Sequence, residues 1–210
     1  MKEFLNILIR TGGRPVYFNR LMENIRLQSY TNYRLIVSAD SDEAEEYVRE
    51  AGITPVRIER MEKSPQYAFP WNLYLNTLME QVTNGWVMFM DDDDMYAHDF
   101  VFQIIERSLP DENTMLVWQM MFPDWRLVPD HFYMNKTPFT RKQIGMPCFA
   151  FHSKWIKHVR FDGQRAGDYR FTNELLRFVK VSWLEVPLVL LDNFGNAGNR
   201  MDLKELKHTK

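Results

Sequence analysis

Four consecutive aspartates, Asp91, Asp92, Asp93 and Asp94, are the residues of this 210-residue chain whose type and spacing point most directly to chemistry. They follow an apolar run at residues 86–90, which predicts a strand buried on both faces. Ligands of open α/β sheets bind beyond the carboxyl ends of such strands. Adjacent carboxylates repel one another by about 1 kcal/mol per pair in a water-like dielectric. A divalent cation relieves that repulsion, and hard oxygen ligands suit Mg²⁺ or Mn²⁺.

A second interpretation of the acidic run is a solvated turn, in which Asp94 or Asp99 caps the following helix. The same ambiguity applies to two other aspartates. Asp40 follows a predicted strand and, taken by itself, favours a turn or a helix cap. Asp168 precedes a predicted helix, where an aspartate is most often the N-cap.

The elements that must position these aspartates alternate between strands and helices. Strands are predicted at residues 4–9, 33–39, 54–58 and 86–90, and helices between and after them at residues 15–28, 42–50, 71–82 and 97–108. This alternation predicts βαβ units and a mainly parallel sheet. The second half predicts strands at residues 114–121, 146–151, 179–184 and 187–191, a strand pair reaching residues 132–134, a short helix at 153–158 and an amphipathic helix after Asp168.

Composition limits the class of protein. The length predicts one domain, with 45% apolar and 26% charged residues, as in a folded globular chain. A net charge of -2 gives no general signal for nucleic-acid binding. A single cysteine, Cys148, excludes an internal disulfide and predicts a buried apolar role, with a reactive thiol as the alternative. No apolar run reaches about 18 residues and no signal-peptide segment precedes Arg10, so we expect a cytoplasmic protein without a transmembrane segment.

Several stretches, in order along the chain, resemble the family 2 pattern of nucleotide-sugar glycosyltransferases. Residues 85–94 resemble the family's glycine, strand and Asp-x-Asp motif. Upstream, the family's "T..RP", "Q.Y.N" and "DDgS" are matched by Thr11, Arg14, Pro15, Gln28, Tyr30, Asn32 and Asp40. Asn72 matches the family's asparagine before the acidic strand, and Asp168 matches the aspartate of its Glu-Asp pair.

The resemblance implies an α/β fold of the GT-A type, Rossmann-like, with a mainly parallel central sheet flanked by helices and a small antiparallel portion on the acceptor side. It also implies one domain over residues 1–210. Residues 1–95 would form the nucleotide-sugar-binding half, residues 96–195 the acceptor-side half, and residues 196–210 a C-terminal tail.

For the donor, the resemblance implies a nucleotide-sugar site made of Thr11, Arg14, Asp40, Asn72, Asp91 and Asp92. Thr11 and Asp40 would lie against the base, with Asp40 accepting a hydrogen bond from a pyrimidine N–H. Asn72 would lie near the ribose and phosphates.

For catalysis, the resemblance implies that Asp93 coordinates Mn²⁺ or Mg²⁺ directly and that Asp91 serves the ribose and the hydration of the metal. Asp168 would be the catalytic base of an inverting transfer, from a nucleoside diphosphate sugar such as a UDP-sugar to an acceptor hydroxyl.

The chain departs from the family pattern at several positions. Arg10 replaces a proline, Gly12 and Gly13 replace Tyr-Asn, and Gly167 replaces the glutamate before Asp168. Many relatives carry a metal-binding histidine near the C-terminus, which this chain lacks, so that Asp192, Asn193, Asn196 or water would substitute.

Two other functions remain open. One is a metal-dependent nucleotidyl or phosphoryl transferase, for which the phosphate loop would be Gly12, Gly13 and Arg14. The other is a non-catalytic nucleotide-sugar-binding module.

Overall fold

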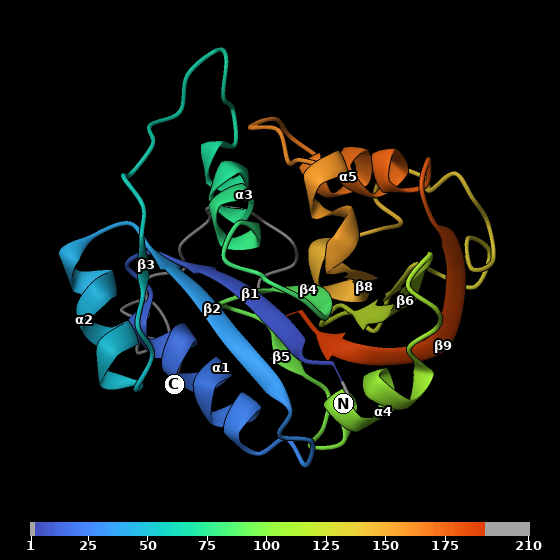
Figure 1. The fold of residues 1–210 in the computed structure, drawn as a ribbon, viewed down its shortest axis with the longest axis horizontal. Helices are drawn as coiled ribbons and strands as arrows, with labels where there is room; N and C mark the ends of the chain where they lie inside the picture. Colours follow the sequence, from blue (N-terminus) through green and yellow to red (C-terminus); the bar gives the residue numbers. More distant parts are fainter. Residues whose placement is uncertain (1–2, 192–210) are drawn as a thin grey trace.

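The computed structural model describes residues 3–191, and in this part nine strands form one continuous sheet (Figure 1). Their order across the sheet is β3-β2-β1-β4-β8-β6-β9-β5, with β7 paired to β6. The strands are β1 (Leu5–Thr11), β2 (Tyr33–Ala39), β3 (Val56–Arg57), β4 (Trp86–Asp91), β5 (Met95–Tyr96), β6 (Thr114–Met121), β7 (Leu127–Val128), β8 (Phe149–His152) and β9 (Lys180–Leu190).

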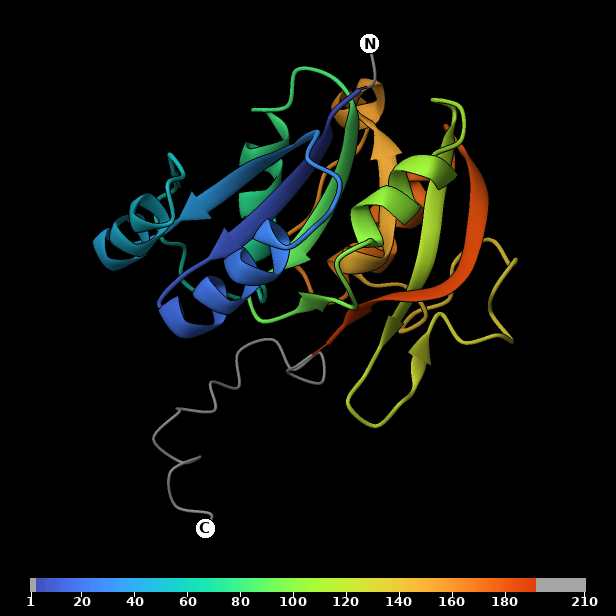
Figure 2. The same ribbon diagram turned by 90° about the horizontal axis from the view of Figure 1, so that it is seen from below.

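Helices cover both faces of the sheet. Figures 1 and 2 place α1, α2 and α4 on one face and α3 and α5 on the other. The α-helices are α1 (Pro15–Arg26), α2 (Asp42–Glu50), α3 (Tyr74–Met79), α4 (Val101–Ser108) and α5 (Gly167–Leu175), and the 3₁₀ helices are η1 (Pro70–Leu73), η2 (Met146–Cys148) and η3 (Ser153–His158). Among the described residues, no helix is long and apolar enough to cross a membrane.

The parallel half of the sheet brings distant strand ends together. β1 lies between β2 and β4 and is parallel to both. The register places Arg10 opposite Asp91 and Thr11 opposite Ala39. The residues that follow these strand ends therefore meet at one edge of the sheet, which we call the carboxyl edge.

The other half is mixed. β8 is antiparallel to both β4 and β6, whereas the long strand β9 is parallel to β6 and antiparallel to β5. The prediction of an α/β fold with a mainly parallel sheet is confirmed, and each antiparallel pair includes a strand from the second half of the chain, as expected.

Residues 179–191 were expected to form two strands, which is wrong. They form the single strand β9, in which Pro187 lies opposite Gln119 at an irregularity in the register with β6. A proline has no N–H to donate to a ladder, and a bulge is one of the few places where a strand tolerates it. The interruption that the proline predicted is a local irregularity and does not end the strand.

Other boundaries also differ from the predictions. The helix expected at 71–82 is η1 followed by the shorter α3, and the helix expected at 97–108 begins only at Val101, because residues 95–96 pair with β9 as β5. Asp94 lies in the preceding turn, where its N–H donates to the carbonyl of Asp91 at 3.2 Å, and Phe100 occupies the position before α4. The strand expected at 146–151 is η2 followed by β8, and residues 132–134 form a turn.

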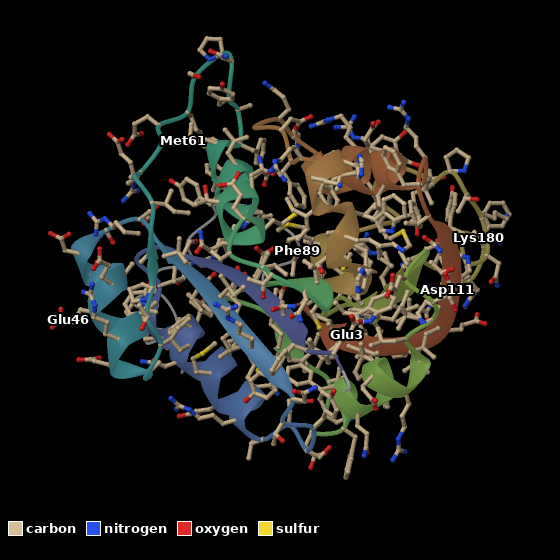
Figure 3. The ribbon with its side chains drawn as sticks, in the orientation of Figure 1. Glu3, Glu46, Met61, Phe89, Asp111 and Lys180 are labelled. Carbon is tan, nitrogen blue, oxygen red and sulfur yellow. The ribbon has the colours of Figure 1, made fainter. Side chains whose placement is uncertain are left out.

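A cluster of buried aromatic rings packs β4 against α5 and the loop before it. Phe89 of β4, labelled near the centre of Figure 3, contacts the rings of Phe149, Phe151, Phe161 and Phe171, with centroids 5.2 to 6.2 Å apart. All five rings are buried. Each fully buried phenylalanine stabilises the fold by about 1.5–3 kcal/mol through removal of apolar surface from water. This cluster fixes α5 and the loop before it against β4.

Candidate active site

Two arginines, Arg10 and Arg14, contact carboxylates of the acidic motif at the carboxyl edge, and Arg20 donates from Nη2 to the carbonyl of Asp93 at 3.0 Å. Arg10 donates from Nε to Asp91 Oδ1 at 2.9 Å. Arg14 donates from Nη1 to Asp93 Oδ2 at 2.7 Å and also contacts Asp92 Oδ1 through Nη2. The guanidinium fork suits this arrangement because it presents donors to two carboxylates at once. The repulsion expected between neighbouring aspartates is therefore relieved in part by side chains of the protein itself.

Asp92 is the innermost member of the motif. Its side chain is fully buried, and Thr11 Oγ1 donates to its Oδ2 at 2.6 Å. The Thr11 hydroxyl also bonds to the hydroxyl of Tyr47 on α2 at 2.7 Å. Burial raises the pKa of Asp92 to about 7, although Arg14 and Thr11 oppose the shift. Thr11 and Asp92 thus link β1, β4 and α2 beneath the edge.

Arg14 is more exposed than the carboxylates that it contacts. Burial alone would lower its pKa, but the charges of Asp92, Asp93 and Asp91 raise it. The residue precedes α1, whose first position is Pro15. Its guanidinium therefore remains charged and close to the acidic motif.

Asp40 follows β2 and does not cap the next helix. Ser41 is the N-cap of α2, and its Oγ accepts from the N–H of Ala44 at 3.1 Å. Asp40 Oδ1 is buried and has no hydrogen-bond partner among the described residues. An unpaired buried carboxylate oxygen is costly unless a ligand donates to it. At the carboxyl edge, Asp40 Oδ1 is therefore the clearest free acceptor for a hydrogen-bond donor of a ligand.

Gly12 allows Asp40 to occupy this position. A Cβ at residue 12 would lie 2.6 Å from Asp40 Oδ1, which is closer than real Cβ contacts. Any larger residue at position 12, in the loop after β1, would therefore displace the Asp40 carboxylate.

A cavity of about 260 Å³ opens beside Asp40. Its other lining residues come from the segment between β3 and η1, from η1 itself and from the first position of α3, namely Arg60, Met61, Glu62, Lys63, Trp71 and Tyr74. In Figure 3 this segment, marked by Met61, rises alongside α3. Lys63 Nζ lies 5.0 Å from the centroid of the Trp71 ring. The cavity thus offers two carboxylates, Asp40 and Glu62, together with aromatic walls and two cationic side chains.

Asp168 lies in the first turn of α5. Ala166, with φ 59°, precedes the helix and has no side-chain cap, so the expectation that Asp168 is the N-cap is wrong. Asp168 Oδ1 accepts instead from the N–H of Tyr169 at 2.8 Å. Burial raises the pKa of Asp168, while the Tyr169 N–H and the charge of Arg10 oppose the rise. A carboxylate with a raised pKa is better suited to accept a proton than an ordinary aspartate.

Arg10 and Gln164 are site residues whose roles could not be assigned from sequence. Arg10 also donates from Nη1 to Asn72 Oδ1 at 2.7 Å, and Asn72 Nδ2 donates to the carbonyl of Gln164 at 3.1 Å. Asn72 therefore connects the carboxyl edge to the loop before α5. The departure of Arg10 from the family pattern was visible in the sequence, but its partners depend on the register of β1 and β4.

The donor set of the acidic motif fits Mg²⁺ or Mn²⁺. Asp91 and Asp93 supply hard carboxylate oxygens at the strand end, and these ions commonly take one or two carboxylates with water and phosphate in the other positions. Arg10 binds one oxygen of Asp91, whose side chain is 24% exposed. Asp92, in contrast, is enclosed by Arg14 and Thr11.

The site residues that were predicted from the sequence and that lie within residues 3–191 are all near one another in the structure. Thr11, Arg14, Asp91, Asp92 and Asp93 form one bonded cluster, Asn72 joins it through Arg10, Asp40 flanks it beyond Gly12, and the charges of Asp91 and Arg10 act on Asp168. Asp192, Asn193 and Asn196, named as substitutes for the missing histidine, and the tail at 196–210 lie outside the described residues. Cys148 is buried as expected, and its pKa is raised by burial to about 12.

Comparison with known families identifies the chain. The model of glycosyl transferase family 2 matches residues 7–166, which is more than half of the 210 residues. The chain therefore belongs to this family, and the resemblance noted in its sequence is confirmed. No curated protein sequence matches it significantly.

Solved structures share the fold. The crystal structure of TarS 1-349 from S. aureus superposes with a TM-score of 0.68 at 16% identity, covering 90% of this chain and 60% of that one. The same protein in complex with UDP-GlcNAc gives 0.65 at 17% identity, covering 89% and 58%. The mannosyltransferase PcManGT from Pyrobaculum calidifontis, in complex with GDP-Man and Mn²⁺, gives 0.67 at 13% identity, covering 94% and 59%.

These similarities confirm the GT-A fold. The chain spans about three fifths of the length of these structures.

Proposed function

We propose that this chain is a metal-dependent inverting glycosyltransferase that moves a sugar from a nucleoside diphosphate sugar to an acceptor hydroxyl. The observation that carries the proposal is the convergence, at one edge of the sheet, of an acidic motif, an unpaired buried carboxylate oxygen on Asp40 and the half-buried carboxylate of Asp168. Family membership supports the reaction class. The neighbours with UDP-GlcNAc and with GDP-Man and Mn²⁺ support a nucleotide-sugar donor and a divalent metal.

In this proposal the base of the donor enters the cavity beside Asp40. Asp40 Oδ1 accepts a hydrogen bond from a ring N–H of the base, a donor that uracil presents at N3 and guanine at N1, whereas adenine and cytosine present none on their pairing edge. Trp71 offers an aromatic wall, and Arg60 and Lys63 offer positive charge near the diphosphate. We propose a UDP-sugar as the donor, because the family resemblance implies that a pyrimidine N–H meets Asp40.

Asp93 and Asp91 hold the metal, and when bound it neutralises charge on the departing diphosphate. Arg14 keeps Asp92 and Asp93 in place from the side of α1. Asp168 accepts the acceptor's hydroxyl proton as the oxygen attacks the anomeric carbon on the face opposite the diphosphate, which inverts the configuration. A positioned base of this kind contributes about 10²- to 10⁴-fold.

The test is the release of nucleoside diphosphate from a panel of UDP- and GDP-sugars with Mn²⁺ or Mg²⁺, in the wild type and in Asp40→Asn. We expect metal-dependent turnover of one UDP-sugar. Asp40→Asn keeps the size of the side chain but replaces the charged acceptor with a neutral amide, so we expect weaker binding of the UDP-sugar. Failure of every nucleotide sugar to bind with metal would overturn the proposal, and binding without turnover in the presence of acceptors would favour the non-catalytic module.

A further inference from the structure

Asn72 has a fixed orientation between two parts of the site. Its Oδ1 accepts from Arg10 at 2.7 Å, and its Nδ2 donates to the carbonyl of Gln164 at 3.1 Å. The side chain is buried, since Asn72 is 8% exposed. Because an amide accepts only through oxygen and donates only through nitrogen, both bonds are made in one orientation alone. Asn72 is therefore a directional link between β1 and the segment at residues 162–168, which consists of the loop before α5 and the first two residues of that helix.

Arg10 is held equally firmly at the other end of this link. It is opposite Asp91 in the register of β1 and β4, and its Nε donates to Asp91 Oδ1 at 2.9 Å. Its side chain is 14% exposed. The planar fork of one guanidinium thus binds a carboxylate of the acidic motif and the amide of Asn72 together.

Gly167 leaves the space that the link needs. A Cβ at residue 167 would lie 2.7 Å from Asn72 Nδ2, so any other residue would displace the amide. Gly167 does not have a positive φ, so this close contact and not the backbone conformation requires a glycine. The two departures from the family pattern therefore act on the same side chain: Arg10 donates to the amide of Asn72, and Gly167 leaves the space that this amide occupies.

We infer that Arg10 is a positioning residue of the proposed reaction, which holds the segment at residues 162–168, and with it Asp168, at a fixed place relative to Asp91 through Asn72. The catalytic consequence rests on the proposed function, whereas the link itself does not. Misplacing a reacting group by about 1 Å can cost about 10²-fold in rate. The charge of Arg10 also opposes the rise of the Asp168 pKa.

The first experiment tests the link without any substrate. Amide hydrogen exchange over residues 162–168 is measured in the wild type, Arg10→Ala, Asn72→Ala and the control Arg177→Ala, an arginine on the exposed surface whose side chain is 68% exposed and pairs with Glu174. We expect exchange to rise at least tenfold in both link variants and to stay unchanged in the control. Unchanged exchange in Arg10→Ala would overturn the inference, and Arg10→Lys, which keeps the charge but not the fork, provides a second folded variant.

The second experiment measures turnover of UDP-GlcNAc, or of whichever sugar nucleotide the panel identifies. In Arg10→Ala we expect kcat to fall about 10- to 100-fold with KM changed much less, partial recovery with added guanidinium, and an acid limb of the pH profile moved to higher pH. A rise in KM with kcat unchanged would overturn the positioning role. Faster exchange in a protein whose wild type turns over no nucleotide sugar would uphold the link and overturn the proposed function.

Discussion

Polar side chains cluster at both ends of the parallel strands β1 and β4, but their hydrogen-bond partners differ. At the end where these strands begin, which we call the amino edge, Asn6 Nδ2 donates to the carbonyls of Asn84 and Trp86 at 2.8 and 3.0 Å. His152 faces Glu3 at 3.2 Å, and Glu112 accepts from Lys154 at 3.0 Å. Figure 3 shows Glu3, at this edge, well apart from Met61 beside the cavity.

The amino edge even resembles a metal site by distance alone. The ligand atoms of Glu3, Glu112 and His152 lie within 4.8 Å of one another. However, His152 Nδ1 accepts from the N–H of Lys154 at 3.3 Å, so that the proton of a neutral ring is on Nε2, facing Glu3. A cation would have to displace that proton and also compete with Lys154 for Glu112.

The carboxyl edge differs from the amino edge in the burial of its carboxylates and in having an acceptor oxygen without a hydrogen-bond partner. Asp92 and Asp93 are buried there, Arg10 and Arg14 bond to the carboxylates of three adjacent aspartates, and Asp40 Oδ1 has no partner within residues 3–191. The difference teaches that a cluster of charges does not by itself mark a site. Buried aspartates, together with an unpaired buried acceptor oxygen on Asp40, distinguish the carboxyl edge among the described residues.

The largest expected effect is at Asp168. Asp168→Asn removes the proton acceptor but keeps the size of the side chain, so we expect kcat for sugar transfer to fall about 10²- to 10⁴-fold. Binding of the donor, measured by calorimetry, should stay within about threefold of the wild type because Asp168 does not contact the cavity beside Asp40. At the amino edge the matched variant His152→Gln should retain wild-type kcat, and an equal loss in both variants would remove the distinction between the edges.

The second largest effect is expected on the affinity for Mn²⁺, which a substitution at the carboxyl edge should lower and one at the amino edge should not. Asp93→Asn should weaken Mn²⁺ affinity about 10- to 100-fold, since a carboxylate ligand becomes a neutral amide. Glu112→Gln should leave the affinity unchanged. Electron paramagnetic resonance of free Mn²⁺ in the presence of UDP gives both values, and a loss in Glu112→Gln instead would place the metal at the amino edge.

The sequence predicted the parallel half of the fold and the place of the site, because both depend on local patterns. The apolar run at 86–90 and the acids after it are contiguous, and α2 has the predicted bounds. The single strand β9 could not be predicted, since its continuity past Pro187 depends on pairing with β6, far away in the chain. The role of Arg10 was missed for the same reason, because its partners Asp91 and Asn72 are more than 60 positions distant.

The pH dependence of turnover should follow the half-buried base. The raised pKa of Asp168 means that the rate falls as the pH drops through a value above the ordinary aspartate pKa of about 3.9, by about tenfold per unit below it. A pH profile of kcat measures this midpoint. The midpoint should stay unchanged in His152→Gln, and a limb that moved with His152 would assign the titration to the amino edge.

The smallest expected effect compares a glycine from each edge. Gly12→Ala places a Cβ 2.6 Å from Asp40 Oδ1 and should move that carboxylate, which costs the donor one hydrogen bond, worth about 1–1.5 kcal/mol or about tenfold in affinity for UDP. Gly85→Ala makes a similar clash, 2.5 Å from the carbonyl oxygen of Phe4, and forces an alanine into φ 88°. It should lower stability by about 1–3 kcal/mol without changing the affinity of the folded protein for UDP. Thermal unfolding and UDP titration of the two variants should therefore give opposite results, because contact with a ligand is expected at one edge only.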